Sequence, residues 1–373
     1  MTTHKPMYTM YGVELSLYSG KLRAYLRFKD VDWQEVAPTK ETFINEILPV
    51  AGAPIIPVIK VNDGTLIQDS TEIIDYIEQR HPEFSVYPTS PKQKLAALLL
   101  EWFGDEWLLI PAMHYRWSYL DQQHDFIMSE FGKRVLPDAT LEQQIAAGEK
   151  ASEPFKNSAQ RLGVLPETIE GIEQSYLEFL AILDKHFTEH NYLFGGRPSI
   201  ADYGFMGSLY AHLGRDPYPS ELMKRHAPNV FKWVERMNAP ISLSGDFLPD
   251  DEIPDALIAI LQVQAKEQLG IIEKIIQANE KFISENPDKS IPRILGFQPF
   301  NIGNSHGEKA IHSYSQWMFQ RAYNYYHSIE GTDKQQVDEL LNQINAYDVF
   351  QTKITNQVAR KYGQLELVTV VGD

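Results

Sequence analysis

Near its N-terminus the chain has short apolar runs rather than long periodic ones. Residues 14–18 and 33–36 are expected to form strands, and residues 21–29 between them a helix, because the apolar residues of 21–29 recur at helical spacing. Residues 57–61 and 65–67 flank the tripeptide Asn-Asp-Gly, a turn sequence that readily joins two antiparallel strands. The predicted order is therefore strand, helix and three further strands.

The next segment, residues 70–80, has the pattern of an amphipathic helix, with isoleucines on one face and acidic or amide residues on the other. Asp69 or Ser70 can cap its start by accepting from free backbone amides. Pro82 and the turn-rich residues 87–91 follow, and proline disfavours helix in the residue before it. We therefore expect a domain boundary at this point.

Beyond that boundary the apolar residues repeat at helical spacing almost throughout. Residues 169–187 carry one continuous apolar stripe and predict a core helix. Ser199 and Asp202 have the spacing of a reciprocal N-cap, so another helix is expected to begin there. Pro228 is expected to open one more, because proline is tolerated in the first turn of a helix.

The last third of the chain begins with a second connector, predicted over residues 239–254 from their richness in Pro, Asp and Ser. After it, residues 257–282 are expected to form one long helix. Residues 291–307 look irregular because glycines interrupt them, and residues 314–326 predict a short helix rich in aromatic side chains. This part is therefore predicted to be mainly helical.

Length and composition exclude several classes of protein. A chain of 373 residues suggests about two domains. Its 34 basic and 50 acidic residues give a formal net charge of -16, without a basic run that could follow a phosphate backbone. Nucleic acid and anionic membrane surfaces are therefore not expected as partners. With no cysteine, the protein cannot form disulfides or supply a thiol nucleophile of its own.

The sequence pattern also gives no sign of a metal site, a signal peptide or a membrane-spanning helix. The 11 histidines include no two-histidine helical motif and no carboxylate partner at metal spacing, so no metal site is expected. Residues 1–10 lack the apolar core of a signal peptide, and the apolar run at residues 95–100 is far too short to cross a bilayer. The expected location is the cytoplasm.

Three separated places resemble the glutathione transferase superfamily. Residues 55–58, with the hairpin and residues 68–77 after them, look like the cis-proline strand and the helix start with an acidic or amide residue followed by serine. Residues 197–203 are similar to the capping motif of the helical domain in that family. Residues 15–19 run into residues 21–29 as the first strand and helix do in the family.

The resemblance covers about residues 12–238 and implies a fold class. It implies a thioredoxin-like α/β domain that binds glutathione at residues 12–88 and an all-helical glutathione-transferase C-terminal domain at residues 92–238. Residues 254–373 are then a mainly helical C-terminal extension, similar to that of a longer subgroup of bacterial transferase-like proteins. Glutathione as a co-substrate, and a homodimer, are the partners that the resemblance implies.

Glutathione is an anionic tripeptide, so its site needs backbone pairing for the cysteinyl unit and polar groups for the two charged ends. Pro57 interrupts an apolar strand, which predicts a special turn and specifically a cis bond. The resemblance implies that the Ile56 backbone then pairs with the ligand, and that Asp69 and Ser70 receive its ammonium and carboxylate ends. The alternative is that Pro57 is a strand-edge proline and that the other two residues only cap a helix.

Activation of the glutathione thiol needs a hydroxyl donor or a positive field at the end of the first strand. Tyr18 and Ser19 are the hydroxyl residues there, and they are the two catalytic candidates. Ser19 is favoured slightly, because a serine in the short turn before the helix shares the positive field of a helix N-terminus. Lys21 could contribute a positive charge or a carboxylate contact, but the favoured interpretation is a solvated lysine in the first helical turn.

The electrophile pocket is expected between the two domains, on an aromatic-rich segment that begins the helical domain. His114, Tyr115 and Arg116 are the candidate pocket residues there. The alternative is that this cluster packs in the core or at a dimer interface, since aromatic stripes at helical spacing usually bury surface. A homodimer is expected because one protomer would not bury all of these side chains.

The function expected from these features is an enzyme that binds glutathione and directs its thiolate at a small electrophile. A non-catalytic binding or dimerisation module with the same fold is the alternative. A specialised glutathione-dependent isomerase or ether-cleaving enzyme is a third possibility. The absence of cysteine argues against the branch of the family that reduces mixed disulfides through its own thiol.

Overall fold

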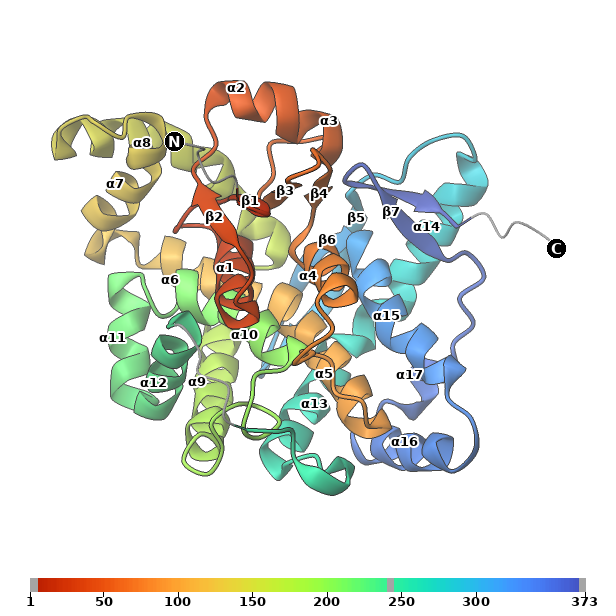
Figure 1. The fold of residues 1–373 in the computed structure, drawn as a ribbon. Helices are drawn as coiled ribbons and strands as arrows, with labels where there is room; N and C mark the ends of the chain where they lie inside the picture. The colour runs from red at the N-terminus through yellow and green to blue at the C-terminus, as the bar shows by residue number, and fades with distance from the viewer. Residues whose placement is uncertain (1–5, 240–244, 369–373) are drawn as a thin grey trace.

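The computed structural model describes residues 6–239 and 245–368. The N-terminal part is built on a four-stranded sheet of order β2-β1-β3-β4, in which β1 runs parallel to β2 and antiparallel to β3, and β3 pairs antiparallel with β4 (Figure 1). The strands are β1 (Tyr8–Tyr11), β2 (Trp33–Val36), β3 (Val58–Val61) and β4 (Leu66–Gln68).

The first strand lies earlier in the chain than the sequence pattern predicted. The strand expected at residues 14–18 is wrong, because helix α1 (Leu17–Lys29) already begins there. Ser16 caps this helix by accepting from the Ser19 amide, which stabilises the helical start where an extended strand was expected. In β1, Tyr8 and Met10 are buried while Thr9 between them is partly exposed, as expected for a strand that covers a core on one face.

A helical segment between β2 and β3 was also missed. It consists of α2 (Lys40–Thr42), the π-helical turn η1 (Phe43–Ile47) and α3 (Leu48–Ala51), and Thr39 caps it by accepting from the Thr42 amide. The N-terminal part is therefore a strand, a helix, a strand, a helical segment, a hairpin and the helix α4.

The predicted hairpin, the helix after it and the cis bond are confirmed. Helix α4 spans Ser70–Arg80, and the Asp69 carboxylate caps it by accepting from the amides of Thr71 and Glu72. The Ile56-Pro57 peptide bond is cis. The chain thus turns sharply just before β3.

Helices alone build the middle of the chain. The predicted helix at residues 169–187 and the reciprocal cap of Ser199 and Asp202 are confirmed. Gly104 approaches helix α10 so closely that a Cβ there would lie 2.4 Å from a Gly204 backbone atom. The elements are α5 (Pro91–Trp102), the π-helical turn η2 (Phe103–Trp107), α6 (Leu109–Ser118), η3 (Leu120–Gln122), α7 (His124–Val135), α8 (Leu141–Ser158), η4 (Gln160–Leu162), α9 (Ile169–His186), α10 (Ile200–Ala211), α11 (Pro217–His226) and α12 (Pro228–Asn238).

The last third is mainly helical but contains two antiparallel hairpins, β5-β6 and β7-β8. Of the predicted connector at 239–254, residues 240–244 lie outside the described residues. The elements are η5 (Pro249–Asp251), α13 (Asp255–Glu267), η6 (Leu269–Ile271), α14 (Ile272–Glu285), β5 (Ile294–Ile302), β6 (Ser305–His312), α15 (Tyr314–Ser328), α16 (Gly331–Gln343), α17 (Tyr347–Gln351), β7 (Val358–Lys361) and β8 (Gln364–Leu367).

Two predictions for this extension are wrong. The long helix expected over residues 257–282 is broken by the 3-10 turn η6, which contains Gly270, a residue of low helix propensity. The segment expected to be irregular, residues 291–307, instead forms β5 and the start of β6.

The extension, coloured cyan to blue in Figure 1, packs along α4 and α5. Trp102 of α5 contacts Phe319 of α15 with ring centres 5.7 Å apart, and Arg321 of α15 forms an ion pair with Asp75 of α4. The aromatic side chains that motivated a dimer are therefore buried within a single chain. They are Trp102, Trp107, Tyr115 and Trp117.

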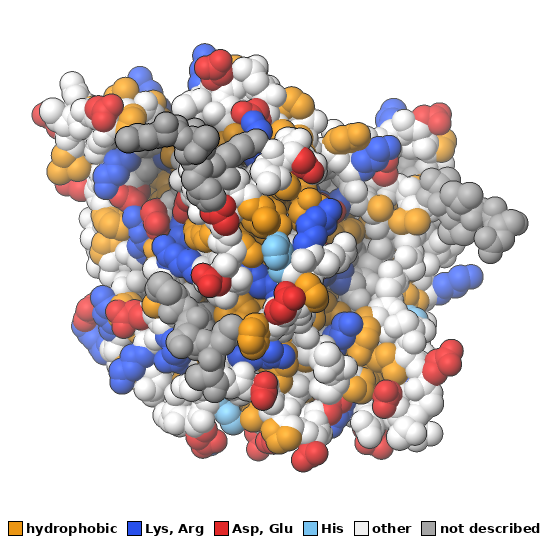
Figure 2. Space-filling view, in the orientation of Figure 1, with side chains coloured by type: hydrophobic (Ala, Val, Ile, Leu, Met, Phe, Trp, Pro, Cys, Tyr) orange, Lys and Arg blue, Asp and Glu red, His pale blue; other side chains and the backbone are white. Residues whose placement is uncertain are grey.

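The surface of the face drawn in Figure 2 carries acidic and basic side chains interspersed, with small apolar groups between them. Among the described residues, no helix has the length and apolar character needed to cross a membrane.

Candidate functional site

A cavity of about 480 Å³ lies between the N-terminal part and the extension. Its volume falls within the range typical of small-molecule sites, roughly 300–1,000 Å³. The structure brings the four predicted glutathione-binding residues, Ile56, Pro57, Asp69 and Ser70, to one wall of this cavity, with Tyr18 beside them. The opposite wall comes from β5, β6, α15 and the β7-β8 hairpin.

Ile56 lies just before β3 with its side chain half-buried. The backbone hydrogen bonds among the described residues do not involve its amide or its carbonyl. Since unpaired backbone groups at a cavity favour a partner, both groups are free to pair with a bound peptide.

Asp69 already has partners on both carboxylate oxygens. Its Oδ1 accepts from the Thr71 amide at 2.9 Å as a helix cap, and its Oδ2 accepts from the Tyr314 hydroxyl at 2.9 Å and forms an ion pair with Arg360. Burial opposes the charge, but Arg360 and Lys21 together hold the pKa of Asp69 below its ordinary value. The extension thus contacts the residue that the sequence placed at the head of the ligand site.

Arg360 belongs to β7 and reaches three residues of the N-terminal wall. Its guanidinium pairs with Asp69, donates to the Gln68 side-chain oxygen and lies 3.8 Å from Glu72. Ser70, beside it, lines the cavity and is buried. A guanidinium and a serine hydroxyl therefore lie together at the N-terminus of α4.

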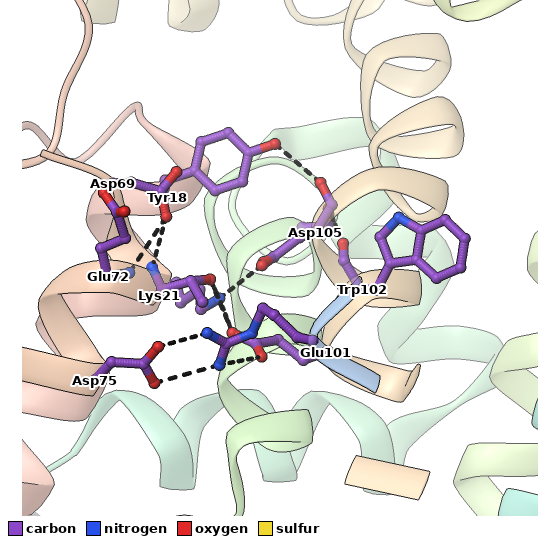
Figure 3. Close-up of polar contacts among 12 residues, drawn as sticks. Tyr18, Lys21, Asp69, Glu72, Asp75, Glu101, Trp102 and Asp105 are labelled. Atoms are coloured by element: carbon purple, nitrogen blue, oxygen red, sulfur yellow. Dashed lines mark hydrogen bonds and ion pairs between the residues drawn. The ribbon is translucent and has the colours of Figure 1, made fainter. Parts of the chain in front are cut away.

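Tyr18 and Ser19 lie in the first turn of α1 and not at a strand end. The Tyr18 hydroxyl faces the cavity but donates to the backbone carbonyl oxygen of Asp105 at 2.9 Å (Figure 3). Burial, together with the nearby Asp105 and Glu106 carboxylates, raises its pKa well above the ordinary value. Ser19 is fully buried, and its hydroxyl accepts from the Val13 amide at 3.4 Å outside the cavity lining.

Lys21 was expected in solvent, and that prediction is wrong. Because α1 begins at Leu17, Lys21 points into the molecule and is fully buried. Its Nζ lies 2.8 Å from Glu101 Oε1, 2.6 Å from Asp105 Oδ2 and 3.0 Å from the Thr71 hydroxyl (Figure 3). Burial alone would lower the pKa of Lys21, but the two carboxylates more than offset it and raise that pKa.

The π-helical turn η2 aims two carboxyl groups at the cavity. Asp105 and Glu106 both line it, at a bulge of the kind often found at functional sites. Burial raises the pKa of Asp105 to about 7 despite its contact with Lys21. Burial also raises the pKa of Glu106, although the Ser315 hydroxyl donates to its Oε2.

The predicted pocket residues His114, Tyr115 and Arg116 do not line the cavity. All three are buried in the helical core, where His114 contacts Glu173 at 2.9 Å and Arg116 forms a two-pronged ion pair with Asp216. Tyr115 stacks on Tyr119 and Tyr218. The structure brings them together with one another, but not with the Ile56 wall.

Four residues of the opposite wall were missed: Gln298, Lys309, Tyr314 and Arg360. Gln298 and Lys309 are cross-strand partners in the β5-β6 hairpin. The signal that could have found this hairpin is the alternation of buried and exposed positions over residues 298–302, followed by a Gly-Asn turn. No comparable local pattern points to Arg360.

Metal chemistry has no evident site here. Within residues 6–239 and 245–368, the structure contains no group of three His, Asp or Glu side chains placed to hold a metal ion.

Comparison with known families decides the classification. Residues 10–85 match the glutathione S-transferase N-terminal domain, and residues 166–236 match the glutathione S-transferase C-terminal domain. The chain belongs to the glutathione S-transferase superfamily. It therefore has the thioredoxin-like domain and the helical domain of that superfamily, followed by further helices and the two hairpins of the extension.

A probable maleylacetoacetate isomerase of Caenorhabditis elegans is 29% identical over 102 residues, which cover 26% of this chain and 45% of that protein. The match thus spans less than half of the length of this relative. Among solved structures, a glutathione S-transferase of Rhodospirillum rubrum is 19% identical, covering 67% of this chain and 98% of its own, with a TM-score of 0.39. A glutathione S-transferase of Methylobacterium radiotolerans, in complex with glutathione sulfonate, is 17% identical, covering 66% and 99%, with a TM-score of 0.38.

Proposed function

We propose that the cavity binds glutathione and that the protein directs the thiolate of glutathione at a small electrophile. The observation that carries the proposal is the convergence of Ile56, Asp69 and Ser70 on one cavity, in a chain that contains both glutathione S-transferase domains. The thiolate is the nucleophile, and holding the two reactants together supplies much of the rate.

The cysteinyl unit and the γ-glutamyl head of glutathione have chemically matched groups on the cavity wall. The unpaired backbone of Ile56 can pair with the cysteinyl unit. The γ-glutamyl head is a zwitterion, and the ion pair of Asp69 with Arg360 offers one charge of each sign to it. Ser70 and the N-terminus of α4 provide further donors for the carboxylate.

Of the two candidate catalytic hydroxyls, we assign the contact with sulfur to Tyr18, because it lines the cavity and Ser19 does not. Its proton is already donated to the Asp105 carbonyl, so it must exchange this partner to stabilise a thiolate. Because the Tyr18 hydroxyl is already hydrogen-bonded to Asp105, a second candidate function is also favoured, namely a glutathione-binding module without catalysis.

The experiment is calorimetric titration with glutathione of the parent and of the double variant Asp69→Ala and Ser70→Ala. Each lost charge-assisted contact is expected to cost on the order of 1.5 to 3 kcal/mol of binding free energy. Ser199→Ala is the matched control, because it removes a helix cap far along the chain and is expected to lower the melting temperature without changing the affinity.

If the double variant binds as tightly as the parent, Asp69 and Ser70 are only a helix cap. A spectroscopic titration of the bound thiol then separates the two functions. A thiol pKa equal to that of free glutathione would support the module and contradict the enzyme.

A homodimer and a cytoplasmic location stay predictions. Light scattering at micromolar concentration tests the first, since a monomer has a mass of 42.8 kDa.

A further inference from the structure

We propose that Lys309 and Gln298 bind the carbonyl oxygen of an uncharged electrophile with a conjugated carbonyl group, and that Lys309 protonates this oxygen when the thiolate adds. The inference rests on the proposed function and names its second substrate. Both residues come from the β5-β6 hairpin of the extension, outside the two matched family domains.

Gln298, in the cavity wall that the extension supplies, has a buried side-chain amide whose hydrogen-bonding groups favour a ligand. Its side chain is 2% exposed and lines the cavity. Neither its Nε2 nor its Oε1 has a hydrogen-bond partner among the described residues. An unpaired buried amide costs about 1–3 kcal/mol, so a ligand that supplies an acceptor and a donor is favoured there.

Lys309 faces Gln298 across the hairpin and also lines the cavity. Its ammonium lies 4.3 Å from the centre of the Trp107 ring, on which it rests as a cation on an aromatic face. The side chain is 7% exposed, and its Nζ lies over the rings of Trp107 and Phe300 and interacts by charge with Glu106. Burial lowers its pKa to about 8, opposed by Glu106.

The surroundings of this pair are apolar, which favours an electrophile with a hydrophobic body. Such side chains exclude water and strengthen a hydrogen bond from Lys309 to a carbonyl oxygen. They come from η2, α6, η4, η6 and α14, and they are Trp107, Leu109, Leu162, Ile271 and Ile275.

The charge next to Lys309 argues for an uncharged electrophile rather than an acid. The cavity lining as a whole carries three acidic residues, Asp69, Asp105 and Glu106, and three basic ones, Lys309, Arg293 and Arg360. Arg360 is paired with Asp69, and Glu106 is the acid that interacts with Lys309. A carboxylate placed beside Lys309 would lie close to Glu106, whose like charge would repel it. A neutral carbonyl oxygen accepts from Lys309 and Gln298 without this penalty.

The addition balances without any further reactant. The sulfur of the thiolate forms a bond to the β-carbon, and the electron pair of the carbon-carbon double bond moves to give an enolate on the carbonyl oxygen. Lys309 donates its proton to that oxygen, and the enol returns a proton to the α-carbon to give the ketone. The thiol proton was released to water, and water reprotonates Lys309.

Among residues 6–239 and 245–368, the titratable groups that interact with Lys309 are Glu106 on η2 and His312 on its own strand. Burial, with Lys309 and Arg161 nearby, lowers the pKa of His312 to about 4, so it is neutral above pH 6. A fall in rate near pH 8 therefore reports on Lys309, and a lysine variant tests this assignment.

The test uses two electrophiles that differ in charge and by one methyl group, benzoylacrylate and its methyl ester, with benzyl bromide as a probe that has no carbonyl group. For each, kcat/KM is divided by the rate constant of the uncatalysed reaction with glutathione. The parent is compared with Lys309→Met, Lys309→Arg and Gln298→Leu, and the affinity for glutathione is measured for all four by calorimetry.

We expect the parent to prefer the ester over the acid, and Lys309→Met to lower the ester value on the order of 100-fold. The values for benzyl bromide and the affinity for glutathione are expected to stay unchanged. The ester rate of the parent is expected to fall above pH 8, where the ammonium is lost, and not to fall in Lys309→Arg, whose guanidinium stays protonated. Gln298→Leu is expected to lower the ester value while leaving this pH dependence in place.

An equal loss for the ester and benzyl bromide would mean that Lys309 only shapes the cavity, and a preference for the acid would mean that the cavity takes anions. Either result overturns the inference, as does a parent that binds glutathione but does not turn over the ester. Failure of the parent to bind glutathione would instead overturn the proposed function. If Lys309→Met does not fold, Lys309→Arg and Gln298→Leu still decide the matter.

Discussion

Lys21 and Lys309 are both buried and both lie next to acidic residues of η2, yet they are held in opposite ways. Lys21 donates to two carboxylates and a hydroxyl, all within 3.0 Å. Lys309 rests on an aromatic ring and faces a cavity. Burial lowers the pKa of each, but it prevails only at Lys309, because close partners more than offset it at Lys21.

The different surroundings indicate that Lys21 stabilises the fold, whereas Lys309 is available to a ligand. Lys21 joins α1 to α4 and α5, and all three of its protons have acceptors. Lys309 lacks such acceptors, and the amide beside it, Gln298, also lacks partners among the described residues. We infer that the first lysine contributes to stability and the second to binding.

The largest effect that tests this contrast is on the free energy of unfolding. Lys21→Met is expected to lower it by about 3–5 kcal/mol, because Asp105 would stay buried without its counter-charge and Glu101 would keep only the more distant Arg321. Lys309→Met breaks no close ion pair and removes a lysine whose lowered pKa costs stability at pH 7, so it is expected to keep or raise the free energy of unfolding. Urea unfolding of both variants at pH 7, followed by circular dichroism, measures the two values. Equal losses in the two variants would contradict the contrast.

The N-terminal wall of the cavity could be predicted from sequence because its signals are local. The cap at Asp69, the Asp-Gly turn and the proline at position 57 each act within a few residues. Capping and turn chemistry are fixed by the backbone groups next to them, so they leave a readable pattern. The start of α1 shows the limit, because the cap at Ser16 was not recognised and both Tyr18 and Lys21 were misplaced.

The opposite wall could not be predicted in the same way. Arg360 meets Asp69 across 291 positions of sequence, and Tyr314 meets it across 245. Such pairs depend on how the extension packs on α4 and α5, which no local pattern specifies. Gly296 and Pro299 also masked the strand β5, because both residues usually interrupt strands. The pocket residues expected at positions 114–116 failed to reach the cavity for the same reason, since the extension and not α6 supplies its second wall.

A smaller effect compares two buried glutamines of the extension. Gln316 is fully buried, and its amide exchanges hydrogen bonds with Asn279, Gln320 and the carbonyl of Asn356. Gln316→Leu is expected to lower the free energy of unfolding by about 1–3 kcal/mol, because those partners lose their contacts. Gln298→Leu is expected to raise it by about 1 kcal/mol, because an unpaired buried amide is replaced by an apolar group of similar size.

Thermal unfolding of the two glutamine variants beside the parent gives the signs directly. A stabilised Gln298→Leu variant that also loses activity toward the ester would show that the amide is kept for binding and not for the fold. A loss of stability in both variants would mean that Gln298 is already satisfied.

The last effect is the pH dependence of stability in Lys309→Met. The pKa of Lys309 is about 8 in the folded chain, against roughly 10.4 in an unfolded one, so the unfolded chain binds more protons between these values. The lowered pKa of Lys309 reduces the free energy of unfolding of the parent at pH 7, and this loss is recovered as the pH rises from 8 to 10. The variant has no such group, so its free energy of unfolding relative to the parent is expected to fall over this range, by about 2 kcal/mol. Lys21, whose pKa is raised, makes its full contribution below about pH 10.4. Lys21→Met also removes the ammonium that lowers the pKa of Asp105, which is already about 7, so this variant is expected to lose stability relative to the parent as the pH rises from 7. Urea unfolding at pH 7, 8, 9 and 10 compares Lys309→Met with the parent, and a constant difference would show that Lys309 has an ordinary pKa and is not poised to donate its proton.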